Sequence, residues 1–346
     1  MTRPVNVAVV GCGYWGPNII RNFFRLPGAR LLAVCDLRQD RLDYVREHFP
    51  GVEVSRDVDA VVTRPDVDAV AVTTPADGHF SLAKRVLEAD KHVLVEKPLA
   101  QRSAHCKELI ALAASRGKTL MVGHTFLYNE AVRKLREFVD TKQLGDIYYL
   151  YSSRLNLGRI RNDINAMWNF APHDVSIILY VLGRKPTTVS ARGQSYIQPG
   201  IEDVVFVHLD FEDGVRAMIH ISWLDPNKVR RMTVVGSKKM VVYDDVSRDA
   251  KIVVYDKGID KVNITDSLGE FESFGEFQLR VRAGDMYVPE IDFVEPLKVE
   301  CAHFIDCIVN GKKPLTDGEE GYGVVKILEG AQTSLEKGGA PVEIPW

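Results

Sequence analysis

A glycine-rich turn directly after a β-branched apolar run is the feature that most constrains the fold of this chain. The run is Val5–Val10, and Gly11, Gly13 and Gly16 follow it with the spacing G-x-G-x-x-G. A helical pattern comes next. Gly11 permits the tight turn, Gly13 lets another group approach the backbone, and Gly16 allows the helix to pack closely on the strand. This order predicts the first unit of a parallel α/β sheet.

The same turn predicts a dinucleotide site. A helix N-terminus offers unpaired N–H groups and a partial positive charge to a pyrophosphate. Asp36 follows Gly16 by 20 residues, at the end of the apolar run Leu31–Cys35. A carboxylate there accepts hydrogen bonds from ribose hydroxyls and repels a 2′-phosphate, which favours NAD over NADP. Arg38 leaves NADP as an alternative to NAD. Its side chain can pair with a 2′-phosphate, or it can lie solvated at the start of the next helix.

The composition excludes several classes of protein. With 346 residues the chain is longer than one core usually supports, so we expect two domains. Its 46% of hydrophobic residues and net charge of −3 indicate a globular protein with neither nucleic acid nor a membrane as partner. No apolar span approaches about 20 residues. Five cysteines without metal-ligand spacing indicate a reducing compartment and no metal, so we expect a cytoplasmic protein.

Apolar runs and helical patterns alternate through the first third of the chain. This alternation is typical of parallel strands joined by helical crossovers, with helices on both faces of the sheet. We therefore predict a doubly wound α/β domain that binds NAD over residues 1–124. Its expected strands are Val5–Val10, Leu31–Cys35, Val52–Val54, Ala69–Val72, Val93–Val95 and Leu120–Val122.

The pattern changes after Gly123. Ala217, Ile219 and Ile221 alternate with polar residues, which suits an antiparallel sheet with one buried face. We predict a second α/β domain over residues 125–346 with a large, mainly antiparallel open sheet, and a substrate cleft between the domains. Its expected strands are Ile147–Leu157, Thr187–Tyr196, Val204–Phe211, Val215–Trp223, Arg231–Val235, Lys239–Tyr243 and Ile252–Tyr255. Its expected helices are Ala131–Val139, Val175–Leu182, Val299–Val309 and Gly321–Glu336.

A lysine at the end of the fifth predicted strand is the first candidate for chemistry. Glu96, Lys97 and Pro98 follow the run Val93–Val95. Ligands of open parallel sheets bind beyond the carboxyl ends of the strands, so we expect Lys97 to point toward a ligand. A desolvated lysine can act as an acid or a base near neutral pH. A solvated lysine paired with Glu96 explains the spacing equally well. Pro98 is a candidate for a cis peptide bond.

Taken in order, the glycine loop, the strand-end acid, Glu-Lys-Pro and a later histidine resemble the Gfo/Idh/MocA family of sugar and polyol oxidoreductases. The resemblance covers essentially the whole chain. It implies a Rossmann domain, then an α/β domain whose open sheet forms homodimers or homotetramers. It also implies that Lys97 contacts the reacting hydroxyl and that His173 accepts or donates the proton. The family's aspartate before this histidine is replaced by Asn169, whose amide cannot exchange a proton, so Lys97 and His173 are the predicted catalytic residues.

The resemblance and the residue types extend the predicted cofactor site. Thr73 and Thr74 end the fourth strand, where the resemblance implies contacts with the cofactor, and His79 follows shortly after. The predicted cofactor-binding residues are Gly11, Gly13, Tyr14, Trp15, Gly16, Asp36, Arg38, Thr73, Thr74, Pro75, His79, Glu96 and Lys97.

The predicted substrate site draws on a segment rich in arginine and asparagine, residues 154–165. Arginine matches phosphate and asparagine matches sugar hydroxyls, although a solvated loop explains Arg161 and Asn162 equally well. Asp174 is expected either to orient the His173 ring or to favour the first turn of a helix. The predicted substrate-binding residues are Lys97, Tyr128, Asn129, Arg154, Asn156, Asn165, Trp168, Asn169 and His173.

These features predict an NAD-dependent oxidoreductase that removes a hydride from a secondary hydroxyl of a sugar. The resemblance favours C3 of a nucleotide-linked hexose, of the UDP-GlcNAc or uronic acid type. An inositol or other free polyol, a monosaccharide, and reduction of a sugar ketone are the alternatives. A dinucleotide-responsive regulator would keep Asp36 but need neither Lys97 nor His173, so the presence of both favours an enzyme.

Overall fold

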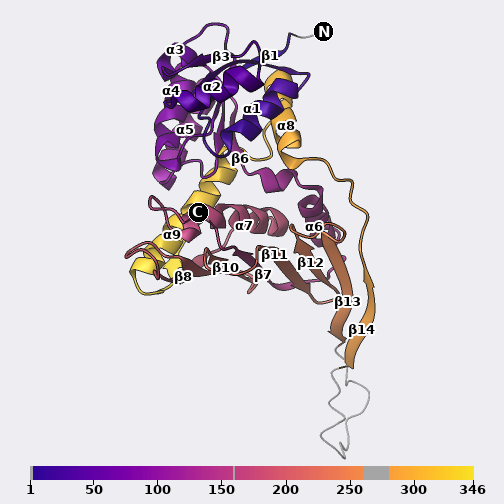
Figure 1. The fold of residues 1–346 in the computed structure, drawn as a ribbon. Helices are drawn as coiled ribbons and strands as arrows, with labels where there is room; N and C mark the ends of the chain where they lie inside the picture. The colour runs from indigo at the N-terminus through magenta and orange to yellow at the C-terminus, as the bar shows by residue number, and fades with distance from the viewer. Residues whose placement is uncertain (1–2, 159, 261–279) are drawn as a thin grey trace, which may run out of the picture. The chain divides into compact units, whose positions relative to one another are not determined.

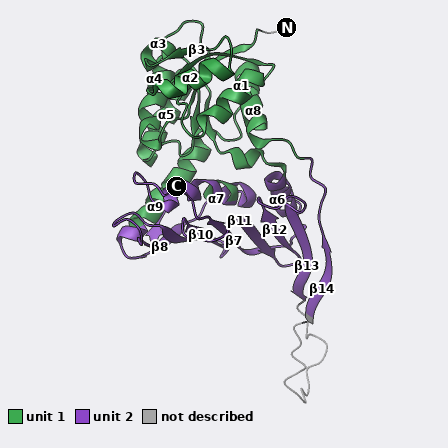
Figure 2. Ribbon diagram, viewed as in Figure 1, with its two compact units in different colours: residues 1–130, 175–177, 293–333 green, residues 131–174, 178–292, 334–346 purple. Residues whose placement is uncertain are grey.

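The chain forms two compact units. The computed structural model describes residues 3–158, 160–260 and 280–346, and Figure 1 labels its helices and strands. Unit 1 consists of residues 1–130, 175–177 and 293–333, and unit 2 of residues 131–174, 178–292 and 334–346 (Figure 2). The units therefore interleave along the chain. The domain boundary between residues 124 and 125 stays a prediction.

Unit 1 contains a six-stranded parallel sheet with the order β3-β2-β1-β4-β5-β6. The strand order reverses between β1 and β4, and open α/β sheets bind their ligands outside the carboxyl ends of the strands at such a point. This topology confirms the predicted doubly wound sheet. The strands are β1 (Val5–Val10), β2 (Ala29–Cys35), β3 (Glu53–Ser55), β4 (Ala69–Val72), β5 (His92–Glu96) and β6 (Leu120–Gly123).

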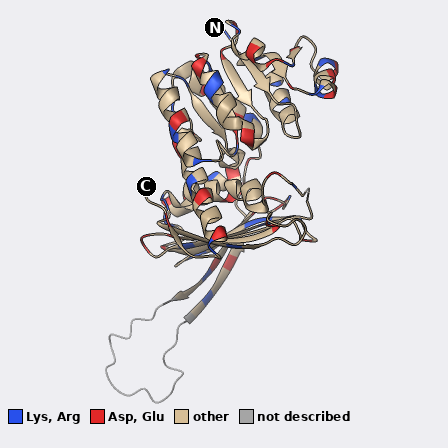
Figure 3. Cartoon of the chain, turned by 90° about the vertical axis from the view of Figure 1, so that its left-hand side faces the viewer, with Lys and Arg blue, Asp and Glu red and all other residues tan. Residues whose placement is uncertain are grey.

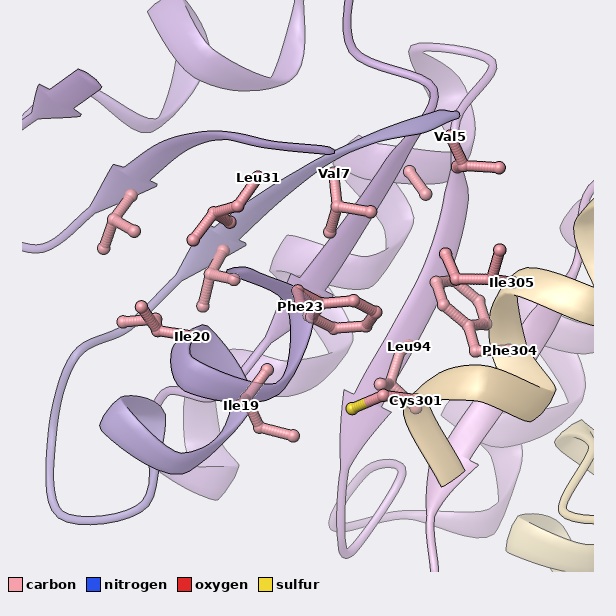
Figure 4. Close-up of a cluster of buried hydrophobic side chains, with 14 of the residues drawn as sticks. Val5, Val7, Ile19, Ile20, Phe23, Leu31, Leu94, Cys301, Phe304 and Ile305 are labelled. Carbon is pink, nitrogen blue, oxygen red and sulfur yellow. The ribbon is translucent and has the colours of Figure 1, made fainter. Parts of the chain in front are cut away.

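Helices from both ends of the chain build the core of unit 1. Figure 4 shows Phe23 of α1 beside Phe304 and Ile305 of α8, next to β1 and β5. The rings of Phe23 and Phe304 meet edge to face at 6.3 Å, and burying each side chain contributes about 1.5–3 kcal/mol. Helix α4 packs against β4, β5 and α5. The helices are α1 (Gly16–Arg25), α2 (Gln39–His48), α3 (Val58–Val62), η1 (Ala76–Gly78), α4 (His79–Glu88), α5 (Ser103–Ser115), η2 (Thr125–Tyr128) and α8 (Pro296–Asn310).

The edge strand β6 is completed by a segment that returns from the C-terminal part of the chain. The Val122 N–H donates to the Thr316 carbonyl, and the Thr316 hydroxyl donates to the Val122 carbonyl, each at 2.7 Å. Helix α9 (Gly318–Glu336) begins beside this strand. A Cβ on Gly321 would come within 2.7 Å of the Val122 side chain. Glycine therefore lets α9 approach β6 closely.

Unit 2 is built on a nine-stranded sheet with the order β14-β13-β12-β11-β7-β10-β9-β8-β15. Strands β7 and β10 are parallel, and the other pairs of described strands are antiparallel. This confirms the predicted, mainly antiparallel open sheet. The strands are β7 (Ile147–Leu155), β8 (Thr188–Gln194), β9 (Val204–Asp210), β10 (Arg216–Ser222), β11 (Val229–Gly236), β12 (Met240–Asp244), β13 (Ile252–Asp260), β14 (Arg280–Tyr287) and β15 (Val342–Glu343).

The two faces of this sheet differ in character. Leu150, Val207 and Ile219 are buried on one face, whereas Tyr151 and Met218 on the other are partly exposed. Two helices of unit 2 are α6 (Glu130–Asp140) and α7 (Ala166–Leu182). Helix α7 covers the buried face, because its Asp174 pairs with a side chain of β7. Period-two alternation thus leaves the other face of the sheet partly exposed.

Several elements of unit 2 differ from the predictions. Helix α7 begins at Ala166 rather than near Val175, and Pro172 lies inside it. Proline has no backbone N–H to donate within a helix, and it disfavours the helical conformation in the residue before it. The sequence pattern therefore did not predict a helix over the first turns of α7. Strand β14 was not predicted. It pairs with β13, which continues to Asp260 rather than ending at Tyr255.

Charged residues of both signs are interspersed over the helices and the β13–β14 ribbon, with few on the strands of unit 1 (Figure 3). This distribution agrees with the small net charge of −3. Among the described residues, no helix is both long and apolar enough to span a bilayer.

Candidate functional site

The glycine loop of unit 1 has the geometry that a dinucleotide requires. Gly11 has a φ of +105°, and a Cβ there would lie 2.8 Å from the Thr73 carbonyl carbon. A Cβ on Gly16 would lie 2.4 Å from the Gly11 oxygen. Contacts within the protein therefore require both glycines. A Cβ on Gly13 would meet nothing within 4 Å. Gly13 thus leaves its backbone open to a bound pyrophosphate, as the motif predicts.

Asp36 connects this loop to the end of β2. Its Oδ2 accepts a hydrogen bond of 2.6 Å from the Cys12 N–H, and its Oδ1 accepts one of 2.9 Å from the Arg38 N–H. Each oxygen keeps a free lone pair for a ribose hydroxyl. The Arg38 guanidinium is exposed and paired with Asp40 at 3.0 and 2.6 Å. This placement agrees with a solvated arginine at the start of α2. Tyr14 and Trp15 in the loop are also exposed.

Residues at the end of β4 contact the glycine loop and fix its position. The Thr73 hydroxyl donates to the Gly11 carbonyl at 2.5 Å. The buried His79 ring lies between two carbonyl oxygens, that of Thr74 at 2.8 Å and that of Pro98 at 2.7 Å. Burial lowers the pKa of His79. His79 therefore joins the ends of β4 and β5, and its contact with the cofactor stays a prediction. Pro75, next to Thr74, is exposed.

Lys97 directly follows β5 at the carboxyl edge of the sheet and is half-buried. Its peptide bond to Pro98 is cis, as the sequence suggested. Burial raises the pKa of Glu96 to about 7 against the opposing positive charge of Lys97. Burial, and to a smaller extent this charge, lowers the pKa of His124 to about 3 and also lowers that of His79. The amine is thus not a solvated surface lysine but lies among buried titratable groups. This is the environment in which a lysine can take part in proton transfer.

Two residues predicted to bind substrate are buried in unit 1. Tyr128 is fully buried, and its hydroxyl lies 2.9 Å from the Thr316 hydroxyl. Burial raises the pKa of Tyr128 far above its usual range. Asn129 is buried as well. Tyr128 belongs to the hydrophobic core that includes residues of α8, and its contact with substrate stays a prediction.

In unit 2, an arginine that was predicted to bind substrate is paired with a carboxylate of the protein. Arg154 of β7 is buried, and its Nε donates to Asp174 of α7 at 2.5 Å. Its Nη2 donates a second hydrogen bond, of 3.4 Å, to Oδ1 of Asp174. This pair gives Arg154 a structural partner, and its contact with substrate stays a prediction. Asp174 lies in the middle of α7 and not in its first turn. Its ion pair with Arg154 joins α7 to β7.

The segment before α7 is largely explained by the helix start. Asn165 is the N-cap residue, and its Oδ1 accepts a hydrogen bond of 3.0 Å from the Trp168 N–H. Its amide nitrogen donates to Glu202 at 2.7 Å. Asn165 is therefore a capping residue, a role that stabilises a helix by about 1 kcal/mol. Arg161 pairs with Asp163 at the surface. Residue 159 of this segment lies outside the described residues.

The remaining predicted substrate residues are accessible. Asn156, Trp168, Asn169 and His173 are each half-buried. His173 precedes Asp174, so the buried ion pair fixes the turn of α7 that carries the imidazole. Among the described residues, no group of His, Cys, Asp and Glu could hold a metal ion.

Sequence models of one protein family match both parts of the chain. Residues 5–124 match the oxidoreductase family with an NAD-binding Rossmann fold, and residues 132–242 match the GFO/IDH/MocA C-terminal domain. Together the matches cover more than half of the chain. The chain belongs to this family, as the resemblance predicted. It is an oxidoreductase and its cofactor is NAD, which the geometry at Gly13 and Asp36 fits.

Three relatives illustrate the range of the family. The chain is 24% identical over 357 residues to scyllo-inositol 2-dehydrogenase (NAD(+)) of Bacillus subtilis (strain 168), covering 99% of this chain and 97% of that protein. It is 25% identical over 344 residues to myo-inositol 2-dehydrogenase of Thermotoga maritima, covering 96% and 97%. The structure of UDP-N-acetylglucosamine 3-dehydrogenase GnnA from Acidithiobacillus ferrooxidans matches with a TM-score of 0.80 at 21% identity, covering 98% and 99%. The chain thus shares its fold with sugar and polyol dehydrogenases.

Proposed function

We propose that this chain is an NAD-dependent dehydrogenase of the secondary hydroxyl at C3 of a nucleotide-linked hexose. The observation that carries the dehydrogenase assignment is a half-buried lysine at the carboxyl edge of a sheet whose glycine loop and Asp36 suit a dinucleotide. The fold shared with GnnA, a UDP-N-acetylglucosamine 3-dehydrogenase, supports this substrate class. The half-buried Trp168 and Asn169 supply a flat ring and an amide suited to a sugar.

The proposed chemistry divides between two side chains. Lys97 donates a hydrogen bond to the reacting hydroxyl and stabilises negative charge as it develops on the oxygen. His173 accepts the proton, because its ordinary pKa lies near neutrality and Asn169 cannot exchange one. Bound NAD supplies the hydride acceptor. The buried pair of Arg154 and Asp174 keeps the histidine on a rigid turn of α7.

A free polyol such as an inositol is the second candidate substrate. Two inositol dehydrogenases match nearly the full length of this chain in sequence. In addition, the engagement of Arg154 with Asp174 removes one cation from those that the sequence assigned to a diphosphate. A polyol would need only hydroxyl partners such as Asn156 and Asn169.

The substrate proposal is tested by NADH formation against UDP-GlcNAc, UDP-GlcNAc uronic acid, free hexoses and inositols. We expect turnover on the UDP-sugars, with NAD preferred over NADP because of Asp36. Turnover restricted to inositols would contradict the proposed nucleotide-sugar substrate but would agree with the dehydrogenase assignment. NAD binding without turnover of any sugar or polyol would favour the regulator instead.

We also propose that the chain is a homo-oligomer whose contact is the outer face of the unit 2 sheet. Tyr149, Tyr151, Phe206 and Met218 are 36% to 46% exposed on this face. Strand register places Met218 opposite Tyr151, and Phe206 opposite His220. Contiguous apolar surface of this kind is typical of an interface.

The five cysteines are free and buried, which supports the proposed cytoplasmic location.

Phe206→Glu is expected to shift the molar mass in solution from an oligomer to the monomer, because a charge would be buried in the proposed interface. Light scattering after size exclusion measures this mass. Val309→Glu, which alters an exposed apolar residue of α8, is the control and should leave the mass unchanged. An unchanged mass in Phe206→Glu would contradict the proposed interface.

A further inference from the structure

A buried histidine lies between the ends of two neighbouring strands of unit 1. His79 is the first residue of α4 and is 1% exposed. Its Nδ1 lies 2.7 Å from the carbonyl oxygen of Pro98, and its Nε2 lies 2.8 Å from that of Thr74. Thr74 follows the end of β4 by two residues, and Pro98 follows the end of β5 by two. One imidazole ring therefore bridges the carboxyl ends of both strands.

Each of these carbonyl groups belongs to a different part of the candidate site. The peptide between Thr73 and Thr74 packs against the glycine loop, because a Cβ on Gly11 would lie 2.8 Å from the Thr73 carbonyl carbon and 2.9 Å from the Thr74 nitrogen. Pro98 is bonded directly to Lys97. The ring thus contacts the chain next to the glycine loop through Nε2, and the chain next to the candidate catalytic lysine through Nδ1.

The number of protons on the ring decides how many of its two contacts are hydrogen bonds. A carbonyl oxygen only accepts, and a neutral imidazole carries a single N–H. A neutral His79 therefore donates to one carbonyl and directs a lone pair at the other, whereas an imidazolium donates to both. Burial lowers the pKa of His79 and the charge of Lys97 acts in the same direction, while the two carbonyl groups and the charge of Asp77 oppose them. Uptake of a proton is thus the step that turns one hydrogen bond into two.

We propose that His79 is a positioning residue that couples Lys97 to the glycine loop, and that the coupling is complete when the ring donates to both carbonyls. The proposal rests on the function proposed above, because Lys97 is the hydroxyl-polarising group there. It accounts for a polar ring at a buried position, where an apolar side chain would pack without the cost of desolvation. The titratable and charged side chains of α4, of the elements packed against it and of the residue after β5 are Lys84, Arg85, Glu88, Asp77, His92, Glu96, Lys97, His105, Cys106, Lys107 and Glu108.

The first test titrates the His79 ring and needs no sugar. Nitrogen NMR of protein labelled at histidine distinguishes a neutral ring from an imidazolium, and the His79 signals are those that His79→Gln lacks. NAD holds the glycine loop in place, so NAD and the second ring proton favour the same coupled form and each strengthens binding of the other. The ring should therefore gain its second proton at a higher pH in the NAD complex than in the free protein. The exposed His48 of α2 is the internal control and should titrate equally in both.

The second test separates the two ends of the ring, at a pH where the ring of the NAD complex carries both protons. Asparagine places its amide nitrogen near the position of Nδ1, and glutamine near that of Nε2. His79→Asn therefore keeps a donor for Pro98, and His79→Gln keeps one for Thr74. We expect His79→Gln to lower kcat by about 2–10-fold, the size of one hydrogen bond, with the NAD dissociation constant close to that of the wild type.

His79→Asn should give the opposite result, with an NAD dissociation constant raised by about 2–10-fold and kcat close to that of the wild type. Denaturant unfolding of both variants shows that the measured enzyme is folded. In a Lys97→Ala background, His79→Gln should not lower kcat further, because effects that act through one residue are not additive. His48→Gln should change neither quantity.

The outcomes distinguish this proposal from the proposed function. A ring titration that NAD does not shift, or a ring that stays neutral in the NAD complex, would overturn the coupling whatever the enzyme turns over. Equal effects of His79→Asn and His79→Gln on kcat and on NAD binding would reduce His79 to a structural residue and overturn its positioning role. If no sugar or polyol is turned over while NAD shifts the titration, the proposed function fails and the coupling of His79 to the glycine loop stands.

Discussion

Lys97→Ala is expected to lower kcat by about 10²–10⁴-fold, the usual contribution of a positioned proton-transfer or charge-stabilising group. The lysine lies at the carboxyl edge of the unit 1 sheet, near the groups Glu96 and His124, whose pKa values burial shifts to about 7 and about 3. The alanine variant keeps the glycine loop and Asp36, so the NAD dissociation constant should change little. Steady-state NADH formation and NAD titration by fluorescence measure the two quantities separately.

Lys298→Ala is the matched control for this experiment. Lys298 is an exposed lysine of α8 in the same unit, and its removal should leave both kcat and NAD affinity at wild-type values. A Lys97→Ala enzyme with wild-type kcat would exclude Lys97 from the mechanism. A large loss of NAD affinity would instead give the lysine a role in cofactor binding.

Asp174→Ala is expected to lower the free energy of unfolding by about 3–5 kcal/mol, because it removes one partner of a buried ion pair and leaves the guanidinium desolvated. Both side chains of the Arg154–Asp174 pair are about 5% exposed, so solvent does not screen the remaining charge. Denaturant unfolding measures the loss. Turnover should fall as well, since His173 is the preceding residue of α7.

The surface pair of Arg161 with Asp163 provides the comparison. These side chains are 34% and 47% exposed, and exposed pairs contribute about 0–1 kcal/mol. Asp163→Ala should therefore cost no more than this amount. Equal losses in Asp174→Ala and Asp163→Ala would show that the buried pair does not hold β7 to α7.

Much of unit 1 could be predicted from the sequence because its signals are local. The apolar runs of β1 and β4 match the predicted bounds Val5–Val10 and Ala69–Val72. The glycine spacing predicted a loop whose sterics the structure reproduces at Gly11 and Gly16. In unit 2, alternation over Ala217–Ile221 placed β10 correctly. Such patterns reflect backbone geometry and burial within a few residues.

The partners of charged side chains could not be predicted in this way, because they depend on tertiary packing. Arg154 pairs with a residue 20 positions away, and its own segment does not indicate which residue that is. The strand pattern does indicate the direction of its side chain. Arg154 lies four residues after the buried Leu150 of β7, and this spacing predicts that both side chains point inward. Glu300 and Glu320 have no comparable signal. Glutamates in helical patterns usually face solvent, and only the return of α8 and α9 to unit 1 buries these two.

A crystal structure of the chain with NADH and the sugar that it turns over tests the central claim most directly. The account predicts that one secondary hydroxyl lies within about 2.6–3.2 Å of both the Lys97 Nζ and a ring nitrogen of His173, with its carbon facing nicotinamide C4. A bound sugar whose reacting hydroxyl is out of hydrogen-bond reach of either side chain would contradict it.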